Sequence, residues 1–217
     1  DIILTSLVEK NKTPSVQYLI FNKDSIIYSF ISGDADISGK KKAGKETIYN
    51  AFSVTKTFTA IAILQLSEQK IIYLNAPVKK YLSNFPFDPS ITVKQLLSHT
   101  SGIPNPLPLR WIHLPQEHDS FDRNSFFRPI FEHHKKLKST PGERYSYSNL
   151  GYVILGQLIE KVTGVTYEQY ITENILNKLL LSQEECRFTI DDSSVHAKGY
   201  QKKIGFSNLI LGLLFDK

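Results

Sequence analysis

The spacing of apolar and polar positions changes near residue 50. Before it the chain alternates in a way typical of strands: two β-rich runs, Val16–Asn22 and Ser25–Ser32, flank a short polar turn and predict a hairpin. Ile2–Lys10 has the spacing of an amphipathic helix. From Ser53 to about Gln69 the spacing is helical and, after the first turn, apolar nearly all round, which predicts a buried helix.

Helical spacing then continues to about residue 180. Thr92 and Gln95 stand three apart, as in a capping box. After a proline-rich stretch, three further helices are predicted: a polar one over Ser120–Lys138, an apolar one over Leu150–Val162 that Gly164 stops, and one capped by Thr166 and Gln169 that ends near Leu180. Extended character returns around Cys186–Ile190 and near Tyr200.

Strands followed by a block of helices and then strands predict an α+β fold rather than alternating βαβ units. We expect an antiparallel sheet flanked by helices, with a large all-helical insertion. Residues 1–52 would form the N-terminal part of the sheet domain, 53–184 the helical domain, and 185–217 an incomplete return toward the sheet.

Composition narrows the possible functions without choosing one. The net charge of +5 includes one basic run, Gly39–Lys45, which is typical of a solvated loop; without interleaved aromatic residues it does not indicate nucleic-acid binding. The apolar runs are far shorter than the roughly 20 residues of a membrane-spanning helix. Cys186 is the single cysteine, which excludes an internal disulfide.

Candidate chemistry begins at Ser53 and Lys56. Residues three apart share a helix face, so the amine can reach the hydroxyl, and serine needs a neighbouring base to become a nucleophile. Burial and the positive end of the helix dipole would both favour a neutral amine. Two other pairs have the same spacing, Ser38–Lys41 in the basic run and Ser67–Lys70 at a polar helix end. The alternative is that Ser53 caps the helix while Lys56 extends toward solvent.

Tyr147-Ser148-Asn149 stands where a loop rich in turn-forming residues enters the apolar helix. A lysine nearby would favour the tyrosine anion and make it a proton shuttle. The alternative is a tyrosine packed at the helix entrance, with Ser148 or Asn149 as the cap.

Four segments, taken in order, resemble the serine β-lactamase and penicillin-binding-protein superfamily, and most closely its branch of class C β-lactamases, D-alanyl-D-alanine carboxypeptidases and esterases. The segments are FSVTKTFTAIAILQL, ITVKQLLSHTSGIP, PGERYSYSNLGYVILGQLIEKVTG and HAKGY, between Pro14 and Tyr200.

The resemblance implies a serine hydrolase that forms an acyl-enzyme on an amide or ester, without a cofactor. Ser53 would be the nucleophile, Lys56 its activating partner, Tyr147 the base, and Asn149 a substrate-binding residue. His99 receives no catalytic role. The substrate would be a β-lactam, a D-Ala-D-Ala-type peptide or a small ester. The protein would be located outside the cytoplasm, in contact with the cell envelope.

One departure from the family pattern concerns its third motif, Lys or His, then Thr or Ser, then Gly, on a strand that supplies part of the oxyanion hole. No such triplet occurs, and Lys203-Ile204-Gly205 is a poor substitute. We therefore expect an incomplete chain that is a poor enzyme alone. The rival hypothesis is a non-catalytic relative that binds cell-wall peptide or lipid.

Two other kinds of site are disfavoured. Gly39–Lys45 matches the start of a phosphate-binding loop, but Glu46 stands where Ser or Thr is needed. The histidines lack the spacing of a metal site, so no metal is expected. The loop Ile103–His118, with Trp111, is either part of the pocket wall or packed on the core.

Overall fold

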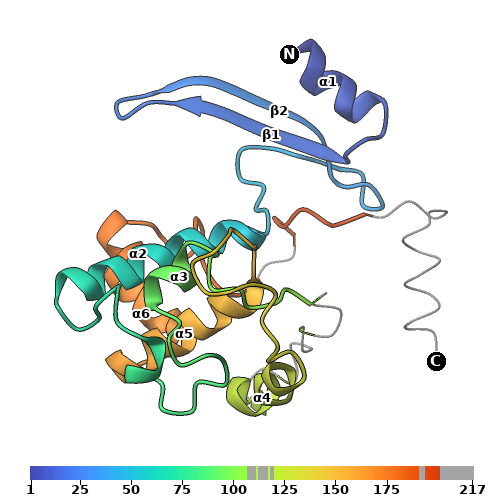
Figure 1. The fold of residues 1–217 in the computed structure, drawn as a ribbon. Helices are drawn as coiled ribbons and strands as arrows, with labels where there is room; N and C mark the ends of the chain where they lie inside the picture. The colour runs from blue at the N-terminus through green and yellow to red at the C-terminus, as the bar shows by residue number, and fades with distance from the viewer. Residues whose placement is uncertain (107–110, 112–116, 118–119, 191–193, 201–217) are drawn as a thin grey trace. The chain divides into compact units, whose positions relative to one another are not determined.

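The computed structural model describes residues 1–106, 111, 117, 120–190 and 194–200 (Figure 1). The chain forms two compact units. One comprises Asp1–Asn50 and Phe188–Lys217, and the other Ala51–Arg187. Each is considered by itself; we call the first the sheet unit and the second the helical unit. Strands in the sheet unit and most of the helices in the helical unit confirm the predicted α+β class.

The sheet unit contains the predicted N-terminal helix and hairpin. Its elements are α1 (Ile2–Glu9), β1 (Ser15–Phe21), β2 (Ile26–Asp36) and β3 (Lys41–Lys42), and the antiparallel sheet has the order β1-β2-β3. At the turn, the side chain of Asn22 accepts hydrogen bonds from the backbone amides of Asp24 and Ser25, which fixes the hairpin. The prediction that the basic run is a loop is only partly correct. Lys42 lies in β3, where it is the antiparallel strand partner of Asp34 on β2, and the two side chains form a 2.8 Å ion pair.

The C-terminal described segment returns to this unit over a few residues. His196 forms a parallel bridge with Ile48, and the Lys198 amide donates to the Ala35 carbonyl. The prediction of extended chain near Tyr200 is thus confirmed in part, by the bridge at His196. The extended segment predicted at Cys186–Ile190 is wrong: that stretch consists of bends and irregular chain.

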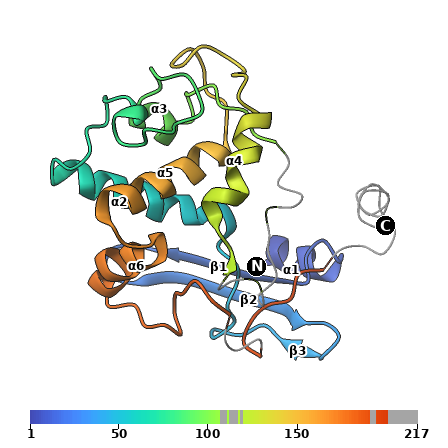
Figure 2. The ribbon, with the colours of Figure 1, turned by 90° about the horizontal axis from the view of Figure 1, so that it is seen from below.

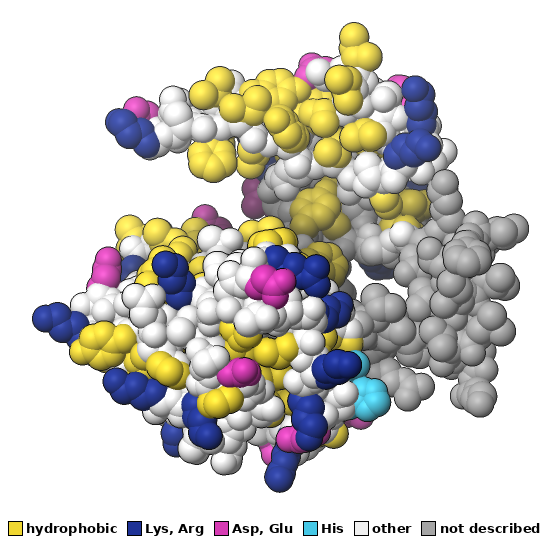
Figure 3. All heavy atoms as spheres, viewed as in Figure 1, with side chains coloured by type: hydrophobic (Ala, Val, Ile, Leu, Met, Phe, Trp, Pro, Cys, Tyr) yellow, Lys and Arg dark blue, Asp and Glu magenta, His cyan; other side chains and the backbone are white. Residues whose placement is uncertain are grey.

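The hairpin leaves large apolar side chains exposed (Figure 3). Those exposed by 43% or more are Tyr18, Leu19, Ile20, Phe21, Ile26 and Ile27. Hydrophobic burial among the described residues therefore lies mainly in the helical unit, where nearly all of the buried apolar residues are found.

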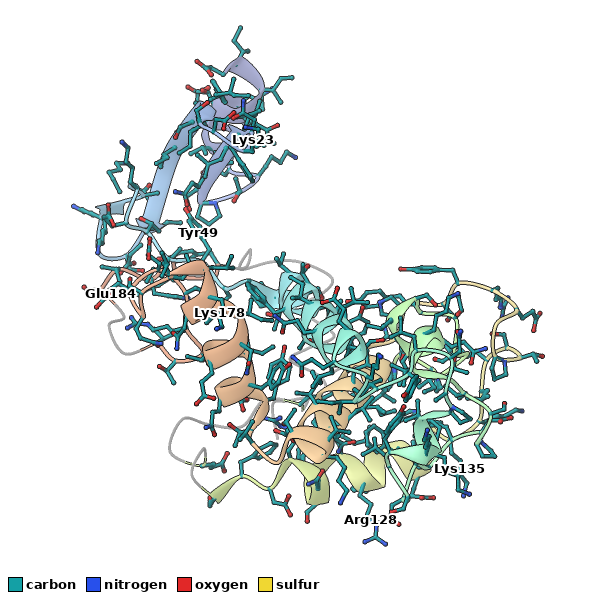
Figure 4. All side chains as sticks on the ribbon, turned by 90° about the vertical axis from the view of Figure 1, so that its left-hand side faces the viewer. Lys23, Tyr49, Arg128, Lys135, Lys178 and Glu184 are labelled. Carbon is teal, nitrogen blue, oxygen red and sulfur yellow. The ribbon has the colours of Figure 1, made fainter. Side chains whose placement is uncertain are left out.

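Helix α5 (Asn149–Thr163) is the centre of the helical unit and packs against α2 (Thr55–Glu68), α3 (Val93–Leu97) and α6 (Tyr167–Ile171) (Figure 2). Leu150, Ile154 and Leu158 repeat every four residues along α5 and are fully buried. Side chains fill the space between these helices, whereas Arg128 on α4 (Arg123–His133) extends away from them (Figure 4). Burial of one continuous face thus holds α5 against the neighbouring helices.

Helix ends follow the capping residues closely. The capping box is confirmed, with Gln95 N–H donating to Thr92 Oγ1 at 3.2 Å and Thr92 N–H to Gln95 Oε1 at 2.9 Å. Gly164, at φ 76°, stops α5 as predicted. The predicted helix Ser120–Lys138 is shorter, because Asp122 caps α4 and the helix ends at His133.

Two helices differ from the simple prediction. After α6 the chain continues through a π turn, Thr172–Leu176, and a 3-10 turn, Asn177–Leu179, before ending at Leu180 in the left-handed region. Helix α2 is buried on one face only, since Ile61 and Leu64 remain 38% and 47% exposed. Within the described part of the chain, no helix is long and apolar enough to cross a membrane.

Candidate active site

Ser53 lies in a 3-10 turn, Phe52–Val54, that leads directly into α2. The predicted helix start at Ser53 is therefore a tighter turn, closed by a hydrogen bond from Val54 N–H to the Ala51 carbonyl. Phe52 has φ 42°, a left-handed conformation that side chains other than glycine rarely adopt. Such strain is commonly kept at functional sites, and here it precedes an exposed serine.

Two polar side chains converge on the Ser53 hydroxyl. Lys56 Nζ donates a hydrogen bond to Ser53 Oγ at 3.2 Å, and Ser53 Oγ lies 2.9 Å from the Tyr147 hydroxyl. Lys56 comes from the first turn of α2, and Tyr147 comes from the loop before α5, 94 residues after Ser53. The structure thus brings together the three residues singled out in the sequence.

Lys56 also faces two aromatic rings. Its Nζ is 5.1 Å from the ring centre of Tyr147 and 5.7 Å from that of Tyr152. Both distances fall within the range of cation–π attraction, which favours an ammonium. This differs from the sequence argument, in which burial and the helix dipole favour a neutral amine; the side chain is only half-buried.

The Tyr147 phenol is set to lose its proton more readily than an ordinary tyrosine. Burial raises its pKa, but the interactions with Lys56 and Ser53 and the positive charge of Lys56 outweigh burial and leave the pKa below its usual value. A phenol beside a cation and an alcohol has the geometry needed to exchange protons with that alcohol.

The turn that carries Tyr147 is fixed by the start of α5. Ser148, which is buried, is the N-cap: its Oγ accepts from Gly151 N–H and donates to the Pro104 carbonyl, both at 3.1 Å. Asn149 is the first helical residue, half-buried, and its N–H donates to Asn105 Oδ1 at 3.0 Å. Of the two caps left open by the sequence, Ser148 is therefore the one used, and Asn149 is joined to the cluster through this turn.

The family resemblance implies that Ser98–Gly102 is a structural loop beside the cleft, but contacts of His99 and Tyr152 with Tyr147 were not predicted. The His99 ring lies against the rings of both tyrosines, with centres 4.5 Å from Tyr147 and 4.9 Å from Tyr152. The Tyr152 hydroxyl donates to the Leu97 carbonyl at 3.0 Å. No spacing signal joins residues 48 or more positions apart; the only hint was the family resemblance, which places the segment of His99 beside the cleft.

The other sequence candidates lie elsewhere. Ser38 is in a turn of the sheet unit, whereas Ser67 and Lys70 are joined by a backbone hydrogen bond at the end of α2. Trp111 packs edge-on against Phe127, at 5.4 Å between ring centres.

Other sequence candidates fall partly or wholly outside the described residues. These are most of the loop Ile103–His118 and all of Lys203–Gly205. Among the described residues, no three His, Cys, Asp or Glu side chains are grouped to hold a metal ion.

The fold and this cluster define a protein of the β-lactamase and penicillin-binding-protein class. The Beta-lactamase family model matches residues 2–203, and the chain belongs to that family. It is 32% identical over 213 residues to Protein flp of Staphylococcus aureus strain MW2, and 31% identical over 157 residues to Penicillin-binding protein 4* of Bacillus subtilis strain 168. These alignments cover 93% and 69% of this chain but 40% and 33% of the relatives, so the chain spans less than half of their length.

Solved structures agree on the fold. The octameric penicillin-binding protein homologue from Pyrococcus abyssi has a TM-score of 0.67 and 33% identity, over 82% of this chain and 42% of its own. EstCE1, a hydrolase with promiscuous acyltransferase activity, has a TM-score of 0.76 and 24% identity, over 93% of this chain and 55% of its own.

Proposed function

We propose that the protein is a serine hydrolase that acts through an acyl-enzyme on an amide or ester. The observation that carries this proposal is the convergence of Lys56 and Tyr147 on the Ser53 hydroxyl, at 3.2 and 2.9 Å. A serine alcohol becomes a useful nucleophile when a neighbouring group accepts its proton, and Tyr147 is in hydrogen-bonding contact with it.

The proposed reaction has two halves. With Tyr147 as the phenolate, Ser53 Oγ forms a bond to the acyl carbon while its proton passes to the phenolate oxygen, and the carbonyl electron pair moves to the carbonyl oxygen. Collapse of this tetrahedral species breaks the bond to the leaving group, which takes the proton from Tyr147. Water then attacks the acyl-enzyme by the same route and regenerates the Ser53 hydroxyl.

Lys56 supports this cycle as a cation. Its charge stabilises the Tyr147 phenolate that accepts the Ser53 proton, and the Tyr147 and Tyr152 rings hold the ammonium in place. Preorganised charge of this kind stabilises a transition state without further rearrangement. Asn149, two residues beyond the phenol, is proposed to bind the side chain or amide of the substrate.

The substrate class proposed is a β-lactam, a D-Ala-D-Ala-type peptide or a small ester. Two relatives above 30% identity are named as a penicillin-binding protein and a homologue of one, which favours acyl donors that react with penicillin-binding proteins. We also propose a place of action outside the cytoplasm, as the family resemblance implies.

A non-catalytic role as a binder of cell-wall peptide or lipid is the second candidate. It rests on the expectation from the sequence that these 217 residues, which span less than half of the relatives' length, do not include the family's Lys/His-Thr/Ser-Gly triplet.

Acylation of Ser53 tests the proposal. The full-length protein is incubated with a penicillin and with an activated ester, and the intact mass and the modified peptide are measured. We expect one acyl adduct on the peptide that contains Ser53, absent from Ser53→Ala and kept in Ser67→Ala, which alters the serine of another Ser-x-x-Lys pair. The same adduct yield in Ser53→Ala, or no adduct with either donor, would favour the binder.

A further inference from the structure

His99 accepts a hydrogen bond from the backbone of each residue next to Tyr147. Its carbonyl accepts a hydrogen bond from Ser146 N–H at 2.7 Å, and its ring Nδ1 accepts one from Ser148 N–H at 3.1 Å. The backbone on each side of Tyr147 is therefore fixed by one residue. His99 is itself buried, with 9% of its surface exposed.

The ring of His99 also sets the plane of the Tyr147 ring. The two rings are tilted by 35°, at 4.5 Å between centres, and Tyr152 lies against His99 with the same tilt at 4.9 Å. Contacts with both rings restrict the direction in which the Tyr147 hydroxyl points, and this hydroxyl is the one that meets Ser53.

From this arrangement we propose that His99 is a positioning residue for Tyr147. Its neutral imidazole, protonated on Nε2 and accepting the Ser148 amide hydrogen at Nδ1, holds the phenol against Ser53. The proposal rests on the proposed function, since it assigns Tyr147 a partner within the same site.

The charge state of His99 follows from its surroundings. An Nδ1 that accepts a hydrogen bond carries no proton, so protonation would place two N–H groups against each other. The groups that face the ring are Lys56 from α2, Tyr145 and Tyr147 from the loop, and Tyr152 from α5. Burial, and then the charge of Lys56, lower the pKa of His99 below its usual value, which keeps the ring neutral at pH 7.

Two amide substitutions distinguish the effect of the hydrogen-bond acceptor at His99 Nδ1 from the effect of side-chain volume. In His99→Asn the side-chain oxygen takes nearly the position of Nδ1, and asparagine tolerates the left-handed φ of 56° found here. In His99→Gln the same amide group is one carbon further out, at the position of Nε2, so Ser148 N–H loses its acceptor.

The test compares wild type, His99→Asn and His99→Gln in the full-length protein. A displacement of about 1 Å at a reacting group costs roughly 10²-fold, so we expect acylation of Ser53 to slow by about 10–100-fold in His99→Gln and by less than about 5-fold in His99→Asn. The loss should appear in the maximal acylation rate rather than in the concentration for half-saturation. Wild type should also lose acylation rate as the pH falls through the His99 pKa, which burial and Lys56 hold below its usual value, and His99→Asn should lack that limb.

A readout independent of turnover is the titration of Tyr147, followed by NMR in protein labelled at the tyrosine ring carbon. We expect the Tyr147 pKa to stay below its usual value in wild type and His99→Asn, and to move toward 10 in His99→Gln. If no donor acylates wild type, the proposed function fails, and this titration still decides the role of His99.

Several results would overturn the positioning role. One is a His99→Gln variant that keeps the wild-type acylation rate and the wild-type Tyr147 pKa. Another is an equal loss of acylation rate in His99→Gln and His99→Asn. Should neither variant fold, ¹⁵N NMR of wild type decides: a cationic His99, or a ring protonated on Nδ1 at pH 7, contradicts the proposal.

Discussion

Replacing Tyr147 by phenylalanine removes one oxygen and keeps the ring that stacks on His99 and faces Lys56. That oxygen lies 2.9 Å from Ser53 Oγ, so the variant should lose the proton acceptor. General base catalysis contributes about 10²–10⁴-fold, equivalent to about 3–5 kcal/mol of barrier. The free energy of unfolding should fall by only about 1 kcal/mol or less, because the lost hydrogen bond is to an exposed serine.

The assay is the rate of Ser53 acylation in the full-length protein, measured by quenched intact-mass analysis, beside urea unfolding of the same preparations. Tyr145→Phe is the matched control, since it makes the same change two residues away on a side chain that is 67% exposed. The wild-type rate should rise with pH toward a pKa below 10, and Tyr147→Phe should lack this rise. An acylation rate within about threefold of wild type would refute the role of the phenol as base, since even a weak general base contributes about 10².

Three further outcomes are expected. Lys56→Met should abolish measurable acylation and move the Tyr147 pKa up toward its usual value, as seen by tyrosine NMR; an unchanged titration would contradict the electrostatic argument. Ser148→Ala should lower the free energy of unfolding by about 1–3 kcal/mol in urea, because two buried backbone groups lose their partner; no change would show that water replaces the hydroxyl. Asp36 has a pKa below 3.8, lowered first by its hydrogen bond with Lys198, so its carboxylate stabilises the sheet unit above pH 3.8 and less as the pH falls further. Asp36→Asn should therefore speed hydrogen exchange at the Lys198 amide at pH 7, with a difference from wild type that shrinks below pH 3.8; equal exchange at pH 7 would contradict this.

Local signals in the sequence were sufficient for most elements of the fold. The hairpin follows from two β-rich runs around a turn that Asn22 closes by itself, and the start of α3 follows from the reciprocal bonds of Thr92 and Gln95. The extended segment predicted at Cys186–Ile190 fails because β-branched and aromatic residues favour extended chain only where a neighbouring strand supplies hydrogen bonds. The limits of α4 were missed because they depend on the Asp122 cap and on contacts with the core.

The sequence by itself determined that Lys56 can reach Ser53, because residues three apart on a helical turn are neighbours whatever surrounds them. It also supplied the residue types of a Ser-Lys-Tyr set through its resemblance to a known family. Only the tertiary structure decided that Tyr147 lies at the Ser53 hydroxyl, and that His99 accepts hydrogen bonds from the backbone amides on both sides of Tyr147. Contacts across 49 and 94 residues depend on how α2, α3 and α5 pack around one core, and a linear pattern does not record such packing.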